Sequence, residues 1–410
     1  MSGLESLLQT RRIAICVGSG GVGKTTVATS LALRAAAKGQ KVLVVTIDPA
    51  RRLANSLGLK ELGNYESRID PGRLADLGLH LEGELWAMML DVKRTSDDLV
   101  ARYASSRKQA ERIYQNKFYQ TASTVLAGSH EYLAMEKLYA LHSEGVFDLV
   151  VLDTPPTRHA LDFLNAPNRV LDLFHNDALR WIATPAVAAG MAGARALGFG
   201  GGYFVRQISK FTGMETLSAL AEFIMSMQGM YGGFKERAAK VKELLASSET
   251  AFVLVTAPGA MNEAHYFHTV LQENEMPLGA VVINRVHPDW RKAGGGELDA
   301  DLLAERFEPS LATRLAETVS EQQIRAEADH GDAGSLAESL SRDIILRLVP
   351  VFERDLHDIS GLAHLARCLF DGDGDPAMAA LPLMEPDPCS SCGKHPNRHG
   401  LSHLEAKTHG

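Results

Sequence analysis

Residues 13–26 of this 410-residue chain read IAICVGSGGVGKTT. The first five residues, 13–17, are apolar and predict a buried strand. Residues 18–25 fit the pattern G-x-x-x-x-G-K-[ST], and an alanine- and leucine-rich segment over 27–37 predicts a helix. A strand, a glycine-rich loop and a helix in this order form a P-loop, in which backbone N–H groups surround a polyphosphate. The stretch therefore predicts an α/β fold that binds a nucleoside triphosphate.

Each residue type in this loop suits phosphate binding. Glycine has no Cβ, so the glycines of the loop let the backbone curl and turn successive N–H groups inward. The Lys24 ammonium adds positive charge, and the Thr25 hydroxyl is a ligand for a phosphate-bound Mg²⁺. A chance glycine-rich turn beside an unrelated lysine would not explain the strand and helix on either side. The predicted nucleotide-binding residues are Gly20, Gly21, Val22, Gly23, Lys24, Thr25 and Thr26.

Composition narrows the class of protein. The chain has 45% apolar and 22% charged residues and a formal net charge of −8, with a pI near 6.0. This balance is typical of a globular protein and indicates no basic surface for nucleic acid. Residues 1–12 lack the pattern of a signal peptide, and four cysteines are too few for the disulfide framework of a secreted protein. We therefore expect a cytoplasmic protein that does not bind nucleic acid.

Apolar runs that alternate with helical patterns organise the rest of the chain. Such alternation predicts a mostly parallel sheet flanked by helices. A helix is expected over 359–370, and residues 371–410, rich in Asp, Gly, Pro and His, predict a flexible tail. The expected strands are 13–17, 41–47, 85–90, 147–152, 251–256, 279–284 and 345–351.

Two aspartates follow predicted strands. Asp48 comes after residues 41–47, and Asp153 comes after 147–152. In such a sheet, ligands bind beyond the carboxyl ends of the strands, where the P-loop also lies. Asp153 is a candidate for holding Mg²⁺ through a metal-bound water, and Asp48 is a candidate for positioning the attacking water. The alternative is that either aspartate caps a helix or forms a turn.

Three ordered motifs resemble the ArsA family of ATPases: GSGGVGKTT at 18–26, TIDPARRLANSLGL at 46–59 and VLDTPPTRHALDFL at 151–164. That family includes subunits of arsenite-efflux pumps and the ATPase that delivers tail-anchored membrane proteins. The resemblance extends over roughly residues 10–370. It implies Mg²⁺-dependent hydrolysis of ATP by a nucleotide-gated dimer, either a homodimer or a heterodimer with a paralogue.

The resemblance also assigns roles to single positions. It implies a first switch that begins at Asp48 and a second switch that begins at Asp153. It further implies that Asn284 and the loop at Pro350 contact adenine. ATP rather than GTP is an inference from the family, and no N-K-x-D guanine signature follows any predicted strand.

The chain departs from the family pattern at several positions. Ser19 stands where the family P-loop has a lysine that reaches the phosphates bound by the partner subunit. Arg51, Arg52 and Arg158 are candidates to sense phosphate in its place, because arginine stabilises phosphoryl charge well. The alternative is that these arginines are surface charges. The zinc-binding CxxC of some relatives is missing, since residues 285–300 contain no cysteine.

A helical subdomain is the candidate binding surface. The resemblance implies that 93–146 and 159–247 form it within an ATPase domain over 1–370. Residues 159–247 are rich in methionine and aromatic residues, which suit a groove for a hydrophobic client helix. The same residues could instead be ordinary core.

The tail holds a second chemical cluster. Cys389 and Cys392 form a CxxC, followed by His395, His399 and His403. This set could bind zinc, and the alternative is a disordered tail without metal. No cysteine cluster resembles the one that arsenite-binding relatives use.

Three functions therefore stay open. The first is an ATP-gated binder of hydrophobic protein segments, which is a chaperone or targeting factor. The second is the ATP-hydrolysing subunit of an arsenite or anion export pump, which would need a membrane partner. The third is a nucleotide-dependent regulatory switch.

Overall fold

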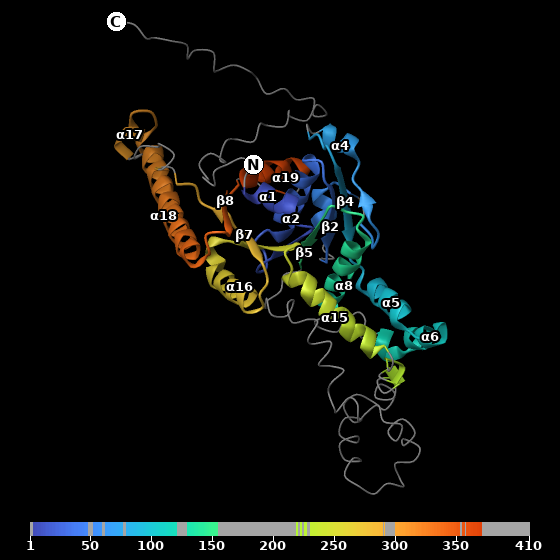
Figure 1. Cartoon of the computed structure of the whole chain (residues 1–410). Helices are drawn as coiled ribbons and strands as arrows, with labels where there is room; N and C mark the ends of the chain where they lie inside the picture. The colour runs from blue at the N-terminus through green and yellow to red at the C-terminus, as the bar shows by residue number, and fades with distance from the viewer. Residues whose placement is uncertain are drawn as a thin grey trace. The chain divides into compact units, whose positions relative to one another are not determined.

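A computed structural model gives the fold (Figure 1). It describes residues 3–47, 52–59, 62–76, 79–120, 129–154, 219, 222–223, 225–227, 230–289, 291, 300–352, 355–356 and 358–370. All of these residues belong to one unit, Met1–Ala380.

Among the described residues, eight strands form one sheet in the order β3-β4-β2-β5-β1-β6-β7-β8. Every neighbouring pair is parallel except β3 and β4, which are antiparallel. The mostly parallel sheet is therefore confirmed. The strands are β1 (Ile13–Val17), β2 (Lys41–Thr46), β3 (Ser67–Arg68), β4 (Glu84–Met89), β5 (Leu149–Asp153), β6 (Thr250–Thr256), β7 (Leu278–Val286) and β8 (Ile345–Pro350).

Helices connect most of the strands, as the alternating pattern predicted. They are α1 (Gly3–Thr10), α2 (Lys24–Ala37), α3 (Arg52–Ser56), α4 (Pro71–Ala75), α5 (Val92–Tyr103), α6 (Arg107–Gln115), α8 (Ser129–Glu144), α15 (Tyr231–Ala246), α16 (Met261–Glu273), α17 (Ala300–Ala304), α18 (Pro309–Ser339) and α19 (Ile359–Phe370). A short 3-10 helix, Pro258–Ala260, precedes α16. The sequence did not predict α1, and it placed α19 at its observed bounds.

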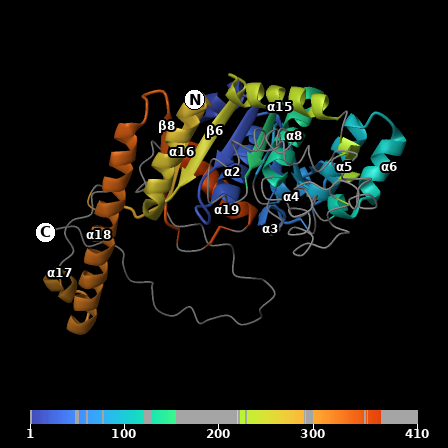
Figure 2. The same cartoon turned by 90° about the horizontal axis from the view of Figure 1, so that it is seen from below.

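The sheet is buried on both faces. In β1, Ile13, Ile15 and Val17 belong to one hydrophobic core, which also takes residues from α5, α8, α15 and α16. Ala14 and Cys16 point to the opposite core, which takes residues from α1, α2 and α19. Figures 1 and 2 show these two groups of helices on opposite sides of the sheet. This double burial explains why β1 is a continuous apolar run.

The two segments predicted to form a helical subdomain, 93–146 and 159–247, contact each other where the structure describes them. Gln109 Nε2 donates to the carbonyl of Ser226 at 2.6 Å, and Asn116 Nδ2 donates to the carbonyl of Ala219 at 2.9 Å. Met227 and Met230 are buried in the core that covers the sheet. For these two methionines the structure favours ordinary core over an exposed groove. The division into a helical subdomain stays a prediction, because residues 155–218 lie outside the described residues.

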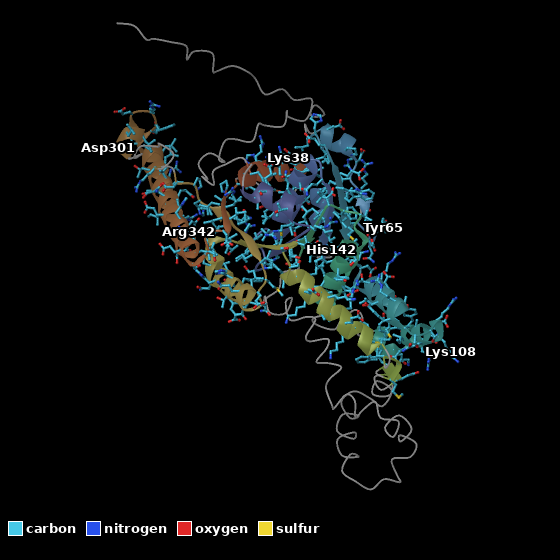
Figure 3. All side chains as sticks on the ribbon, viewed as in Figure 1. Lys38, Tyr65, Lys108, His142, Asp301 and Arg342 are labelled. Atoms are coloured by element: carbon cyan, nitrogen blue, oxygen red, sulfur yellow. The ribbon has the colours of Figure 1, made fainter. Side chains whose placement is uncertain are left out.

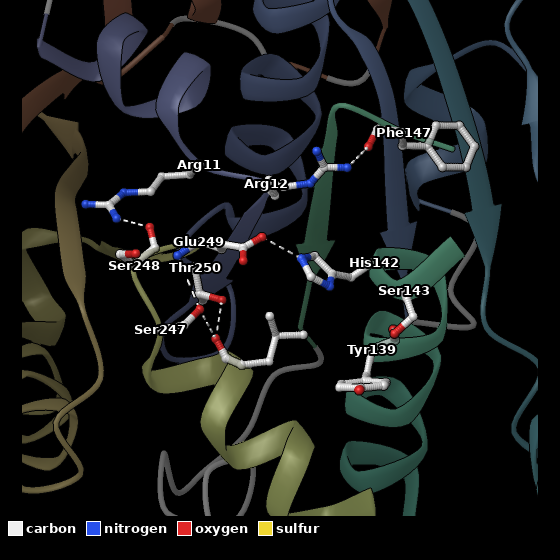
Figure 4. Close-up of polar contacts among 11 residues, drawn as sticks. Arg11, Arg12, Tyr139, His142, Ser143, Phe147, Ser247, Ser248, Glu249 and Thr250 are labelled. Atoms are coloured by element: carbon white, nitrogen blue, oxygen red, sulfur yellow. Dashed lines mark hydrogen bonds and ion pairs between the residues drawn. The ribbon is translucent and has the colours of Figure 1, made fainter. Parts of the chain in front are cut away.

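Polar contacts join the elements at the amino-terminal edge of the sheet (Figure 4). The Arg12 guanidinium donates to the carbonyl of Phe147 at 3.1 Å, which links β1 to the approach to β5. His142 of α8, labelled in Figure 3, lies 2.8 Å from a carboxylate oxygen of Glu249, just before β6. The Thr250 hydroxyl donates to the carbonyl of Leu244 at 2.8 Å and so anchors the start of β6 to α15. These contacts are structural and lie at the opposite end of the strands from the P-loop.

Candidate active site

The P-loop lies where the order of the strands changes direction. β1 is paired with β5 on one side and β6 on the other. From β1 the chain passes over β5 to reach β2, and from β5 it crosses β1 to reach β6. In open α/β sheets the connections diverge at such a point and leave a crevice at the carboxyl ends of the strands. The topology therefore places the candidate site at the carboxyl end of β1.

Glycine is required by the backbone of the loop. Gly18 has a φ of 149° and Gly23 has a φ of 97°, which side chains rarely allow. A Cβ on Gly18 would lie 2.0 Å from the carbonyl oxygen of Val255, and a Cβ on Gly23 would lie 2.4 Å from Nδ2 of Asn284. The loop is thus curled tightly against β6 and β7. This is the cradle that a polyphosphate needs.

Lys24 lies inside this cradle. It is the first residue of α2, and Gly23 is the N-cap. Its Nζ donates to the carbonyls of Gly18 at 2.9 Å and Ser19 at 2.7 Å, and the residue is 6% exposed. The ammonium and the amino-terminal end of α2 therefore give the loop a positive potential that favours an anion.

Asp153 links its own strand, β5, to β2 and to the P-loop helix α2. It is the last residue of β5 and is 1% exposed. Its Oδ2 accepts hydrogen bonds from the hydroxyls of Thr25 at 2.7 Å and Thr46 at 2.9 Å. The Thr25–Asp153 contact joins the two residues that the sequence proposed as Mg²⁺ residues. Hydroxyl and carboxylate oxygens are ligands of the kind that Mg²⁺ prefers, so the residues present fit this ion.

Thr46 was not among the predicted site residues. It is the last residue of β2 and is directly paired with Asp153 across the sheet. A signal existed in the sequence, because Thr46 is a polar residue within an apolar run that leads to Asp48. The neighbouring position of β2 and β5 could not be read from the chain order, since β5 lies 103 residues further along.

The residue after Asp153 is anchored to β1. The Thr154 hydroxyl donates to the carbonyl of Cys16 at 2.7 Å. This contact holds the beginning of the predicted second switch against the strand that precedes the P-loop. Burial and the nearby Asp153 raise the pKa of the Cys16 thiol, which keeps it neutral. Cys16 is a core thiol, and so is the buried Cys368 of α19.

Asn284 lies against the P-loop. Its Nδ2 donates to the carbonyl of Val22 at 2.8 Å, and its Oδ1 accepts from the backbone N–H of Arg285 at 3.0 Å. Pro350 ends β8 and is paired with Val286 of β7, so both residues stand at the carboxyl edge. Their predicted contacts with adenine stay predictions. The structure adds a role for Asn284 that the sequence did not reveal, which is to support the loop.

Several predicted site residues lie outside the described residues. These are Asp48, Arg51, Arg158, Cys389 and Cys392, and for Arg52 only the backbone, at the start of α3, is described. Within the part of the chain that the structure describes, no group of three His, Cys, Asp or Glu residues could hold a metal ion. Nor does any helix there have the length and apolar character to cross a membrane.

The fit between Gly23 and Asn284 leads to a stability prediction. Gly21→Ala should lower the free energy of unfolding by about 1–2 kcal/mol, the cost of left-handed backbone for a residue with a Cβ. Gly21 has a φ of 80°, and its Cβ would contact nothing within 4 Å. Gly23→Ala should cost more, because its Cβ would also collide with Asn284 Nδ2. Urea unfolding of both variants compares them, and equal losses would contradict the close approach of Asn284.

Comparisons with known proteins agree with this geometry. The sequence profile of the family described as anion-transporting ATPase matches residues 11–300. ATPase BagA of Mycobacterium tuberculosis is 24% identical over 313 residues, which cover 73% of this chain and 74% of that protein. ATPase get3 of Schizosaccharomyces japonicus is 33% identical over 166 residues, covering 40% of this chain and 47% of that protein. A candidate arsenical pump-driving ATPase of Prosthecochloris vibrioformis is 30% identical over 161 residues, covering 38% and 36%. Because the profile matches more than half of the chain, the protein belongs to the ArsA family of ATPases and is an ATP hydrolase.

Proposed function

We propose that hydrolysis of ATP occurs at the P-loop with Mg²⁺, which Thr25 binds directly and Asp153 holds through a water. The observation that carries this proposal is the hydrogen bond of 2.7 Å from the Thr25 hydroxyl to Asp153 Oδ2. A P-loop hydroxyl in contact with a strand-end carboxylate is the arrangement that P-loop ATPases use around their metal. When bound, the ion would offset negative charge on the phosphates.

The other residues act by position and charge. Lys24 and the N–H groups of residues 20–26 bind the phosphates and stabilise the charge that grows during transfer. Asp48, two residues beyond the end of β2, accepts a hydrogen bond from the attacking water and orients it. Asn284 and the loop at Pro350 contact the adenine.

We propose that the chain works as a dimer, with a second copy or with a paralogue. A chain with one P-loop needs a partner to complete a site shared between two subunits. Ser19 has no charge to offer that partner, so Arg51, Arg52 and Arg158 are the candidates to sense phosphate. Zinc binding by Cys389 and Cys392 stays a separate prediction about the tail.

The role that we favour is nucleotide-gated binding of a hydrophobic protein segment, as in chaperones and targeting factors. The support is the sequence of residues 159–218, which holds Met191, Met214, Trp181, Phe204 and Phe211. Flexible methionine-rich surfaces adapt to apolar helices of different sequence. Because Met227 and Met230 are buried in the core, the groove would be built from this earlier part of the insertion.

The alternative is the ATP-hydrolysing subunit of an export pump, which the family description as anion-transporting favours. Against it, the two cysteines within the described residues, Cys16 and Cys368, are buried in different elements. Metalloid ions bind to accessible thiolates, and a buried thiol is not accessible to them. A regulatory switch with slow turnover is the third possibility.

The steady-state ATPase rate of the full chain distinguishes these roles. We expect a transmembrane-helix peptide to change the rate severalfold, because ordering of a client groove should be linked to the nucleotide state. Arsenite and antimonite should have no effect. The control is a peptide of equal length whose apolar run is interrupted by charged residues. Stimulation by metalloid alone would contradict the client role and support the pump, and a slow rate indifferent to all additions would support the switch.

A further inference from the structure

Thr46 contacts the proposed metal site without being one of its predicted residues. We infer that Thr46 is a positioning residue, whose hydroxyl fixes the orientation of the Asp153 carboxylate and thereby sets the affinity of the nucleotide site for Mg²⁺. This inference rests on the proposed role of Asp153. The end of β2 would then contribute to metal binding through Thr46, in addition to preceding Asp48 in the chain.

The geometry is that of a fixed carboxylate. Asp153 Oδ2 accepts two hydroxyl hydrogen bonds, from Thr25 of α2 at 2.7 Å and from Thr46 of β2 at 2.9 Å. These donors come from two different elements. Thr46 and Asp153 are also direct partners in the ladder between β2 and β5, so the backbone holds both residues in register. With one oxygen bound from two directions, the plane of the carboxylate is defined.

Both partners in the hydrogen bond between Thr46 and Asp153 are buried, which increases the expected effect of losing it. Thr46 is 2% exposed and Asp153 is 1% exposed, so bulk water does not replace a lost hydroxyl. A buried carboxylate that loses one donor is free to turn toward another polar group. A change in the orientation of the Asp153 carboxylate would weaken its hold on a cation. Groups that orient a direct metal ligand typically change metal affinity by about 10–100-fold when removed, and because Asp153 acts through a water we expect the lower end of this range for Thr46.

The two hydroxyls have different tasks in this arrangement. Thr25 belongs to the P-loop, and its hydroxyl, which donates to Asp153, would also hold the metal. Thr46 belongs to β2, which is paired with a strand on each side, and its task is to hold Asp153 whether or not nucleotide is bound. The alternative is that the Thr46 hydroxyl only joins β2 to β5, which would affect stability but not the response to Mg²⁺.

The test measures binding of a fluorescent ADP analogue to the full chain while Mg²⁺ is titrated. Thr46→Val keeps the shape of the side chain and removes the hydroxyl, and Thr46→Ser keeps the hydroxyl. Thr250→Val is the matched control, because Thr250 is also a buried strand threonine with a hydrogen-bonded hydroxyl, but at the opposite end of the sheet. Thermal unfolding of each variant without nucleotide is recorded alongside.

We expect Thr46→Val to raise the half-saturating Mg²⁺ concentration by about 10-fold and to leave the affinity for the analogue in EDTA unchanged. Thr46→Ser should restore the wild-type Mg²⁺ response, and Thr250→Val should lower the unfolding temperature without altering that response. An unchanged Mg²⁺ response in Thr46→Val, or an equal shift in Thr250→Val, would overturn the inference and leave the proposed function standing. If binding to the wild-type chain did not respond to Mg²⁺, the proposed metal role would fail and this inference with it.

Discussion

Replacing Lys24 with methionine is expected to lower kcat for ATP hydrolysis by about 10²–10³-fold, the effect of removing one donor that stabilises charge in the transition state. Methionine has a similar length but carries no charge, so it loses the hydrogen bonds from Nζ to the carbonyls of Gly18 and Ser19. Those contacts place the ammonium inside the loop, where a phosphate would be surrounded by the N–H groups of residues 20–26. Steady-state hydrolysis and binding of a fluorescent ATP analogue measure the two consequences separately.

Lys38→Met is the matched control for Lys24→Met. Lys38 follows the last residue of the same helix, α2, and is labelled in Figure 3. Its side chain is 44% exposed and lies 3.7 Å from Glu5, an ion pair of little energetic weight. Removing this charge should leave hydrolysis unchanged. A Lys24→Met variant with wild-type kcat would show that the ammonium is not needed at the transition state, and the proposed mechanism would be wrong.

The part of the fold that the sequence predicted well is the part that burial determines. Residues 13–17 were expected as a strand and form β1 with those bounds, because both faces of β1 are covered and every side chain must be apolar. The last helix was also predicted at its observed bounds, 359–370, because it is rich in apolar residues and most of its side chains are buried. By contrast, β3 is only the two residues Ser67 and Arg68, which are too few to show any periodicity.

Contacts between residues on different strands of the sheet, or between a strand and the P-loop, could not be predicted from the sequence. The P-loop motif identified Thr25 and Lys24 without a structure, because their spacing is local. The Thr46–Asp153 contact depends on β5 lying beside β2, and the Asn284–Val22 contact depends on β7 lying near the P-loop. Chain order alone does not fix either neighbour. These are the contacts through which distant segments support the site.

The methionine-rich residues 159–247 show a second kind of structural question that the sequence could not answer. Helical spacing of apolar residues predicts one buried face, but it does not say whether the core or a partner covers that face. For Met227 and Met230 the core covers it. For residues 159–218 the question stays with the peptide experiment.

Asp48→Asn is expected to reduce hydrolysis by about 10²–10⁴-fold while binding of ATP persists, the typical effect of losing a general base or water-orienting carboxylate. Asp48 comes two residues after the end of β2, and β2 lies directly beside β5, which ends in Asp153. The carboxyl ends of parallel neighbours meet at one edge, so we expect Asp48 to lie near the edge where the P-loop lies. Asparagine keeps the shape but cannot accept a proton. Single-turnover hydrolysis and nucleotide binding, measured on the same preparation, separate chemistry from affinity.

The chain provides a close control in Asp91. It comes two residues after the end of β4, the parallel neighbour of β2, and Thr46 is paired with Met89 at the end of that strand. Its Oδ1 accepts from the backbone N–H of Arg94 at 3.0 Å and so caps α5. Asparagine caps a helix about as well as aspartate, so Asp91→Asn should leave both stability and hydrolysis nearly unchanged. If Asp48→Asn behaved like Asp91→Asn, Asp48 would be a cap or turn residue, and the water would have to be oriented by another group.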